Sequence, residues 1–380
     1  MRRSLVSILL VAAAGGAASR AAADDSVFGI RGLGILGRPV SARTAATGGG
    51  FAVFDAQALL NPAALGQLQG VTGWAVGAPS RRRAVVGGGA ATLQSTRFPL
   101  FGFGTVFSRR LVIGVGIGDY LDRTWSVRRT DTVTLRGTPV PVEDVSRSVG
   151  GVSDLRLAGA YRLSPRFTLG AAVHALSGST RLTVTRDFAP ADYEDFSDVA
   201  VTDFTGLGVS VGVLAAVRSN LGVAASLRAG TKLKASSSAG PRARVSLPLE
   251  LAAGARYAPV SGVNLVGSVT YAGWGRAAGD LVAAGEARSW DVWSVGAGLD
   301  VERLDLGVVR LPLRLGYRWR QLPFPIDGFR LGEHAIAGGF GFTMAGGRTS
   351  VDVGVERGAR TAGAQRETFT AGWLGVTVRP

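Results

Sequence analysis

The chain has 380 residues, of which 46% are hydrophobic and 18% charged, so it can bury enough apolar surface to form ordered structure. It contains no cysteine, which excludes disulfides, thiolate metal sites, iron–sulfur clusters and cysteine nucleophiles. The net charge of +15 would suit nucleic acid, but only Arg81 to Arg83 form a basic run, and no nucleic-acid partner is expected.

Residues 1–23 are predicted to be a secretory signal peptide. A basic start is followed by a mostly apolar run from Leu5 to Ala18, and the alanines at 21–23 form a small-residue cleavage site. A lone N-terminal membrane anchor is the alternative, but the run is shorter than the ~20 residues of a spanning helix. Because no later stretch of that length is free of polar residues, the sequence excludes a helical membrane protein.

Residues 24–69 form a second segment, which is apolar and rich in glycine but shows no alternation. Asp55 is expected to cap a short helix that runs through Leu60. Asn61 and Pro62 are a turn signal, after which a helix is expected to restart at Ala63.

From residue 70 to residue 380 the sequence alternates with a period of two, which is typical of strands with two different faces. Leu155, Leu157 and Leu163 alternate with Arg156 and Arg162, for example. The stretch 245–257 is predicted to be one such strand. The seven tryptophans lie mostly toward strand ends, as the aromatic girdles of a membrane barrel would.

The connections between these strands are of two kinds, which alternate along the chain. Tight turns are expected at 108–110, 164–165, 219–220, 259–262, 302–304 and 346–347, and long polar loops at 124–148, 187–198, 236–241, 274–288 and 323–333. Short turns at one end and long loops at the other are typical of an outer-membrane β-barrel. About fourteen strands are predicted, with an open question at Gly87 to Gly89, which either kink one strand or divide two. A secreted β-sandwich or propeller is the alternative.

The reason to prefer a closed barrel is that unpaired backbone amides are too costly in hydrocarbon. The apolar parity then faces lipid and the other parity faces the lumen. The charged residues predicted to line the lumen are Arg156, Arg162, Arg228, Lys232, Glu250, Arg256, Asp300, Arg314, Arg318, Asp352 and Glu356. They would either hold a carboxylate head group or form an arginine–acid network that braces the barrel.

The run from Val40 to Asp55, with Gly48, Gly49, Gly50 and Phe51, followed by Asn61, Pro62 and Ala63, resembles the N-terminal motif of FadL-type outer-membrane transporters and their PorV-like relatives. The resemblance implies an all-β, antiparallel fourteen-stranded barrel, 70–380, with an N-terminal hatch of short helices and loops, 24–69, in its lumen.

The resemblance also implies a monomer in the outer membrane that passes hydrophobic or amphipathic small molecules such as long-chain fatty acids, gated by the hatch. A static plug is the alternative for that segment. The PorV-like relatives imply a different function, in which the barrel holds a secreted protein partner without transport.

Catalysis is not expected, and neither is a cofactor or metal. The chain offers only His174 and His334 as histidine bases. Strand parity directs His174 inward and His334 toward lipid, so the two do not share a site easily. No nucleophile elbow, histidine cluster or phosphate loop accompanies them.

Overall fold

The computed structural model describes residues 27–86, 89–190, 192–240, 242–305 and 310–380. The predicted signal peptide, 1–23, lies outside this part of the chain. Within it, no helix combines the length and the apolarity needed to cross a membrane.

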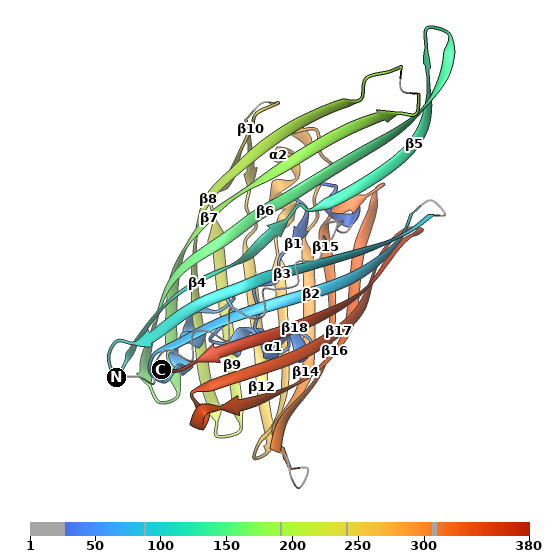
Figure 1. Cartoon of the computed structure of the whole chain (residues 1–380). Coiled ribbons are helices and arrows are strands. Elements are labelled where there is room, and N and C mark those ends of the chain that lie inside the picture. The colour runs from blue at the N-terminus through green and yellow to red at the C-terminus, as the bar shows by residue number, and fades with distance from the viewer. Residues whose placement is uncertain (1–26, 87–88, 191, 241, 306–309) are drawn as a thin grey trace, which may run out of the picture.

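Fourteen of the described strands close into an antiparallel barrel, which confirms the predicted fold (Figure 1). They are β2 (Thr72–Val86), β3 (Gly89–Val106), β4 (Leu111–Asp122), β6 (Thr138–Ser164), β7 (Phe167–Phe188), β8 (Phe196–Arg218), β9 (Leu221–Gly230), β12 (Glu250–Val260), β13 (Val263–Ala272), β14 (Val292–Asp305), β15 (Arg310–Ile326), β16 (Phe329–Met344), β17 (Thr349–Ala362) and β18 (Gln365–Val378). The last strand pairs with the first, with Thr377 opposite Trp74, and this closes the ring. Val86 at the end of β2 pairs with Gly89 at the start of β3, so two strands meet here rather than one kinked strand; residues 87 and 88 lie outside the described part of the chain.

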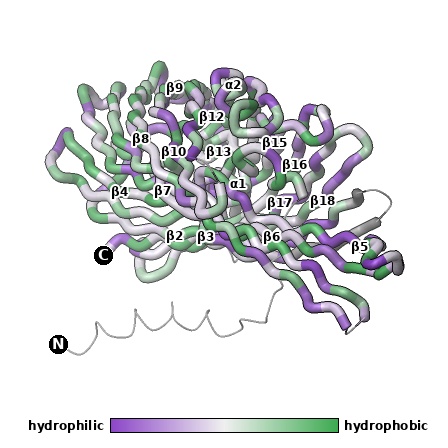
Figure 2. Tube along the Cα trace, turned by 90° about the horizontal axis from the view of Figure 1, so that it is seen from above, coloured by the Kyte–Doolittle hydropathy of each residue, from purple (hydrophilic) through white to green (hydrophobic). Residues whose placement is uncertain are grey.

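Short elements precede and interrupt the barrel strands. Before β2 come η2 (Val27–Gly29), β1 (Ile35–Leu36), α1 (Ala42–Ala46), η3 (Ala52–Phe54) and η4 (Pro62–Gln67), and later come η5 (Trp274–Ala277), α2 (Ala278–Ala283) and η6 (Ala345–Gly347). Seen from above, α1 lies inside the ring of strands (Figure 2).

The two faces of the wall meet different surroundings, as predicted. Leu155 and Leu157 are 48% and 60% exposed on the outer face, whereas Arg156 between them is 2% exposed and faces the lumen. The exposed side chains on the outer face of the other strands are likewise mostly aliphatic and aromatic. A continuous apolar outer face with polar residues inside is what a barrel in a lipid bilayer presents.

The connections differ in part from the prediction. The tight turns are confirmed except at 302–304, because β14 continues to Asp305 with an irregular register between Val301 and Leu304. At the other end, the predicted loop 323–333 is mostly strand, because β15 continues to Ile326 and β16 begins at Phe329. The predicted loop 124–148 is strand too, a hairpin of β5 (Trp125–Leu135) and the first half of β6. This hairpin, with the ends of β7 and β8, forms a wing that extends beyond the barrel (Figure 1). A strand that lies above a bilayer needs no apolar face, so the polar residues of this hairpin have the composition that is typical of a loop.

Two further expectations are wrong. The stretch 245–257 is not one strand, because β11 (Ala243–Ser246) ends before Pro248 and β12 begins after it. Proline removes a donor from the ladder, and before it β10 (Lys232–Ser237) and β11 form a separate hairpin, in which β10 pairs with β8. Of the tryptophans, Trp74, Trp125, Trp274 and Trp373 are buried rather than exposed at a lipid interface.

Candidate functional site

The segment from residue 27 to residue 68, called the hatch segment below, occupies the lumen of the barrel. Its helix α1 packs against β15 to β18, and η4 packs against β6, β7 and β8 on the opposite side. Ala45, Val53 and Ala63 are completely buried, although no strand alternation predicts this. The segment therefore crosses the lumen from wall to wall.

The glycines of the predicted motif lie where the hatch segment touches the wall backbone to backbone. Gly48 has a positive φ of 62°, and a Cβ there would lie 2.5 Å from the backbone nitrogen of Tyr317. The facing positions of the wall are glycines as well. A Cβ on Gly316 would lie 2.2 Å from the nitrogen of Gly48, and a Cβ on Gly296 would lie 2.4 Å from the carbonyl oxygen of Gly48. Glycine on both sides is therefore a steric requirement of this contact.

Asp55 has a different role from the one expected. No helix runs from Asp55 to Leu60, because Asp55 ends η3 instead of starting a helix. Its buried carboxylate accepts hydrogen bonds from Thr44 Oγ1 at 2.6 Å, from the backbone nitrogen of Gln57 at 2.9 Å and from the Ser41 hydroxyl. These hydrogen bonds offset the cost of burying the carboxylate, and they tie two parts of the hatch segment together.

Asn61, Pro62 and Ala63 open η4, close to the expected restart at Ala63. The Asn61 side chain accepts from Ala63 N at 3.0 Å and caps the helix. Its amide nitrogen donates to the carbonyl of Val53 at 2.9 Å and to that of Val213 in β8 at 3.2 Å. One side chain therefore caps the helix and also fixes the hatch segment to the barrel.

Ion pairs join the hatch segment to the wall on the side of β14 to β17. Arg38 Nη1 lies 2.8 Å from Glu356, and Arg43 Nε donates to Asp300 at 3.0 Å. On the wall itself, Arg314 bridges Asp300 at 3.1 Å and Asp352 at 2.6 Å. The hatch segment is thus held by Asp300 and Glu356, two acidic residues that strand parity predicted to face the lumen.

Arg318 continues this network upward along the wall. It donates to Glu356 and Glu333, and Glu333 also accepts from Arg320 at 2.8 Å. The interior positions Arg318 and Glu333 are 4% and 1% exposed. Most of these charges are paired with each other, which matches the bracing interpretation better than an open anion site.

The opposite wall carries a second polar group. Arg228 Nη1 lies 2.9 Å from Asp154, and its guanidinium stands over the ring of Tyr120 with 4.7 Å to the centroid. The Tyr120 hydroxyl donates to Glu250 at 3.3 Å, across the lumen from β4 to β12. Arg156 is buried beside this group, and its Nε and Nη1 have no hydrogen-bond partner among the described residues.

Three of the predicted lining residues lie away from these groups. Arg162 donates to the carbonyls of Gly66 and Leu68, both at 2.7 Å, and anchors the end of the hatch segment. Arg256 stands 6.0 Å from the ring of Phe54. Lys232 does not line the lumen, because it is exposed at the start of β10, where its Nζ pairs with Asp280 of α2 at 2.9 Å.

A small chamber lies between the hatch segment and the wall, with a volume of about 210 Å³. Apolar and polar side chains both face it, among them Leu36, Ala52, Leu60, Tyr120, Arg228, Glu250, Ala252, Trp274, Arg318 and Gln321. The sequence marked its charged residues as inward-facing, but it did not reveal this cavity, which depends on how the hatch segment folds back.

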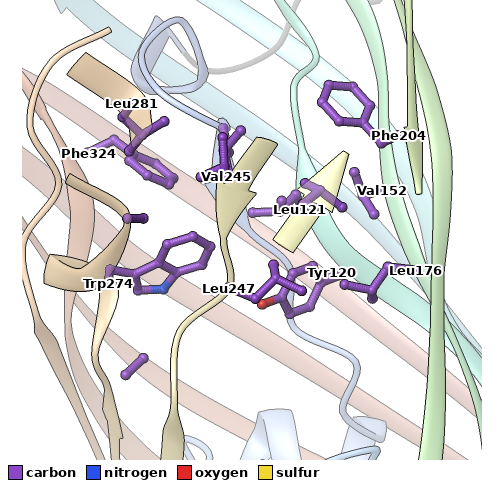
Figure 3. Packing of buried hydrophobic residues seen from close by; sticks show 14 of the residues in the cluster. Tyr120, Leu121, Val152, Leu176, Phe204, Val245, Leu247, Trp274, Leu281 and Phe324 are labelled. Atoms are coloured by element: carbon purple, nitrogen blue, oxygen red, sulfur yellow. The ribbon is translucent and has the colours of Figure 1, made fainter. Parts of the chain in front are cut away.

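An apolar cluster covers the chamber on the side of the wing. Figure 3 shows Trp274, Leu281 and Phe324 packed near Val245 and Leu247, with further members from β4, β6, β7 and β8 on the other side. This apolar cluster is called the lid cluster below. Asp280, next to its member Leu281 in α2, holds it to the β10–β11 hairpin through hydrogen bonds from Lys232 and Ser246. Hydrogen bonds from Ser246 and Lys232 lower the pKa of Asp280 to about 2.

The chamber is separated from the outside by a thin part of the wall. Ser226, Ala252 and Trp293 border the chamber and also an open, apolar groove of about 1200 Å³ on the outer face. This part of the wall is built from β9, β12 and β13, which have 10, 11 and 10 residues. Here a single layer of strands, with the small side chains of Ser226 and Ala252, separates the chamber from the groove.

The two histidines lie as strand parity predicts. His174 is 2% exposed and faces the lumen, whereas His334 points outward from β16. His174 Nδ1 lies 2.9 Å from Asp154, and Nε2 lies 2.8 Å from Ser210 Oγ. The partners Asp154 and Ser210 were missed, because parity shows which face a residue occupies but not its height in the barrel.

No family model matches the sequence, and the comparison with curated proteins found no match. Solved structures do match over most of the chain. The Pseudomonas putida toluene transporter TodX is 15% identical with a TM-score of 0.59, covering 93% of this chain and 99% of its own. The Ralstonia pickettii toluene transporter TbuX is 14% identical with a TM-score of 0.56, covering 91% and 99%.

A FadL homologue from Pseudomonas aeruginosa is 13% identical with a TM-score of 0.58, covering 90% of this chain and 98% of its own. At these identities the likeness concerns the fold. The chain therefore has the plugged, fourteen-stranded barrel fold of the FadL and TodX structures, and the resemblance that its N-terminal motif suggested is confirmed at that level.

Proposed function

We propose that the protein is an outer-membrane channel that passes small hydrophobic or amphipathic molecules, with residues 24–69 acting as a movable hatch. The observation that carries this proposal is the chamber of about 210 Å³ between the hatch segment and the wall, in a barrel whose outer face is apolar. The fold shared with two structures described as toluene transporters supports it.

The size of the chamber favours a ligand of about one aromatic ring. Cavities of ~150 Å³ bind benzene, whereas sites for drug-sized ligands measure ~300–1,000 Å³. With about 210 Å³, the chamber holds a single substituted ring and is too small for an extended long-chain fatty acid. Tyr120, Arg228 and Gln321 offer hydrogen bonds to one polar substituent, so an amphipathic ring such as a phenol fits as well.

Passage through the chamber requires a movement, because the hatch segment lies on one side and the lid cluster on the other. A ligand would enter past the lid and leave after the loop at Gly48 moves away from Gly316. A second exit, sideways into the bilayer, is available where Ser226 and Ala252 form the thin wall to the outer groove. Both routes run down the concentration gradient of the ligand.

The test fills the chamber from one side of the wall. Ala252→Phe places a ring in the chamber, whereas Ala253→Phe places the same ring on the outer face one residue later. Uptake of radiolabelled toluene into proteoliposomes should fall at least ~10-fold for Ala252→Phe and stay unchanged for Ala253→Phe. Equal uptake by both folded variants contradicts transport through this chamber.

A second function is favoured by the wing. The hairpin of β5 and β6 projects beyond the barrel with the ends of β7 and β8, and most side chains of β5 are exposed. Such a surface suits the alternative role, in which the barrel holds a secreted protein. A surface pull-down from cells with and without residues 128–145 tests it: loss of a captured secreted protein with unchanged toluene uptake supports attachment by the wing.

A further inference from the structure

Three side chains on adjacent strands form a hydrogen-bonded relay inside the barrel, apart from the ion pairs that join the hatch segment to β14 to β17. Asp154 in β6 accepts from His174 Nδ1 in β7, with 2.9 Å and 3.0 Å to its two oxygens. His174 Nε2 lies 2.8 Å from the hydroxyl oxygen of Ser210 in β8. All three are at most 3% exposed.

The ladder explains why the three side chains meet. His174 lies opposite Gly208, which has no side chain, so the imidazole can turn toward Ser210 two residues further along β8. Asp154 lies opposite Leu176, two residues from His174, so the second contact is also diagonal. Each contact joins inward positions that differ by two residues, a spacing that cross-strand side chains of this length can span.

The order of atoms matches the arrangement that activates a serine. In such triads the carboxylate fixes the tautomer and orientation of the imidazole, and the imidazole nitrogen on the far side takes the hydroxyl proton. Asp154 also accepts from Arg228 at 2.9 Å, so a second charged donor holds the carboxylate in place. The relay thus has a hydroxyl, a base and an oriented acid in the required sequence.

Two guanidinium groups flank this relay. Arg228 lies directly opposite Ser210 on β9, and Arg156 lies directly opposite His174 on β6. Arg156 is 2% exposed, and its Nε and Nη1 find no hydrogen-bond partner in the described part of the chain. Buried donors without partners are costly unless an acceptor arrives, and fixed positive charge favours an oxyanion that develops nearby.

We propose that Ser210, His174 and Asp154 form an acyl-transfer site that cleaves small carboxylic esters in the lumen. Ser210 Oγ attacks the ester carbonyl while His174 Nε2 takes the hydroxyl proton. The bond from the carbonyl carbon to the alcohol oxygen then breaks, and His174 returns the proton to the leaving alcohol. Water, activated by His174, attacks the acyl-serine, releases the carboxylic acid and restores Ser210.

The chamber sets the substrate class. Arg228, which opposes Ser210, also lines the chamber of about 210 Å³, whereas Ser210 does not line it. The chamber has room for an ester with one ring or a short acyl chain, which would reach the relay past Arg228 once the hatch segment moves. The hatch segment shields Ser210 in this state, because Asn61 packs against Gly212 two residues away. Acylation therefore requires the hatch segment to move, but it does not require net transport.

The test uses a fluorophosphonate probe, which reacts with activated serines, and 4-nitrophenyl acetate, on the purified full chain in detergent. The probe should attach to Ser210, as shown by peptide mapping, and Ser210→Ala should abolish both labelling and ester cleavage. His174→Gln should slow labelling ~100-fold or more, because a general base contributes ~10²–10⁴-fold. Ser148→Ala, which removes a buried hydroxyl elsewhere on β6, should change nothing.

The decisive measurement does not depend on the variants folding. If the folded wild-type chain, checked by its heat-dependent mobility, carries no label on Ser210, the proposal is overturned. Labelling of Ser210 at the same rate in folded His174→Gln overturns it too, since the hydroxyl would then not be activated. Labelling that rises with pH as His174 loses its proton supports the proposal, and a purely structural hydrogen-bond network would not produce it.

Discussion

The contact between the Gly48 loop and the wall can be tested by adding one methyl group. In Gly316→Ala the new Cβ would lie 2.1 Å from the carbonyl carbon of Thr47 and 2.2 Å from the nitrogen of Gly48. Both are backbone atoms, so no side chain can rotate away, and the hatch loop itself must move. β15 tolerates the change, because alanine is no worse than glycine within a strand.

The magnitude follows from the cost of overpacking. Inserting a methyl group into a close-packed contact costs ~1–3 kcal/mol. If this cost falls on the docked state alone, the ratio of displaced to docked hatch rises ~5- to 150-fold. The barrel wall should keep its stability, since the clash lies between the wall and the hatch segment.

The assay is single-channel conductance in planar bilayers, together with hydrogen exchange of residues 42–54. Gly316→Ala should open more often and exchange faster in the hatch segment. Gly267→Ala is the matched control, because its Cβ would lie 3.8 Å from the nearest backbone oxygen, an ordinary contact. If the two variants behave alike, the glycine contact does not hold the hatch and the reasoning fails.

Three further changes test other contacts. Arg38→Met removes the ion pair between Arg38 and Glu356, while Glu356 keeps its pair with Arg318. Hydrogen exchange of residues 35–46 should become faster. The docked hatch should lose stability by no more than the ~3–5 kcal/mol that breaking a buried ion pair costs. Asn61→Ala removes the cap of η4 and also the hydrogen bonds to the carbonyls of Val53 and Val213. It should destabilise the docked hatch by more than the ~1 kcal/mol of the cap alone, read from the urea dependence of proteolysis at 60–68. The pKa of Asp280 is lowered from 3.8 to about 2, so its contribution to the stability of the lid cluster is complete above pH 3.8 and is lost as the pH falls through about 2. Pepsin should therefore cut α2 only toward pH 2. Asp280→Asn should remove this pH dependence.

The barrel could be predicted because its two solvents impose a strict period. Leu155 and Arg156 cannot exchange faces without exposing a charge to lipid, so the alternation is visible in the sequence itself. The wing lacks this constraint, since both faces of β5 meet water, and there the prediction failed. The prediction of one strand over 245–257 was wrong for the opposite reason. Val245 and Leu247 are apolar because they belong to the lid cluster, not because they face lipid.

For the candidate site, the sequence predicted which residues face the lumen but not which of them contact one another. Strand parity placed Arg314, Arg318 and Glu356 in the lumen, but their partners depend on the register, which shifts from strand to strand around a sheared barrel. Arg38 meets Glu356 across 318 positions of sequence, and no local pattern specifies that distance. The glycine motif was recognisable, whereas the glycines of the wall that receive it were not.

His174 illustrates the same limit and shows why it matters for function. Taken from the sequence, it was a single inward histidine without a nucleophile, because Asp154 and Ser210 lie 20 and 36 positions away on either side. Two diagonal steps across β6, β7 and β8 bring them together, and each step needs a glycine or a matching register that composition does not reveal. Sites assembled from neighbouring barrel strands are therefore invisible to motif analysis even when every member has been assigned to the correct face.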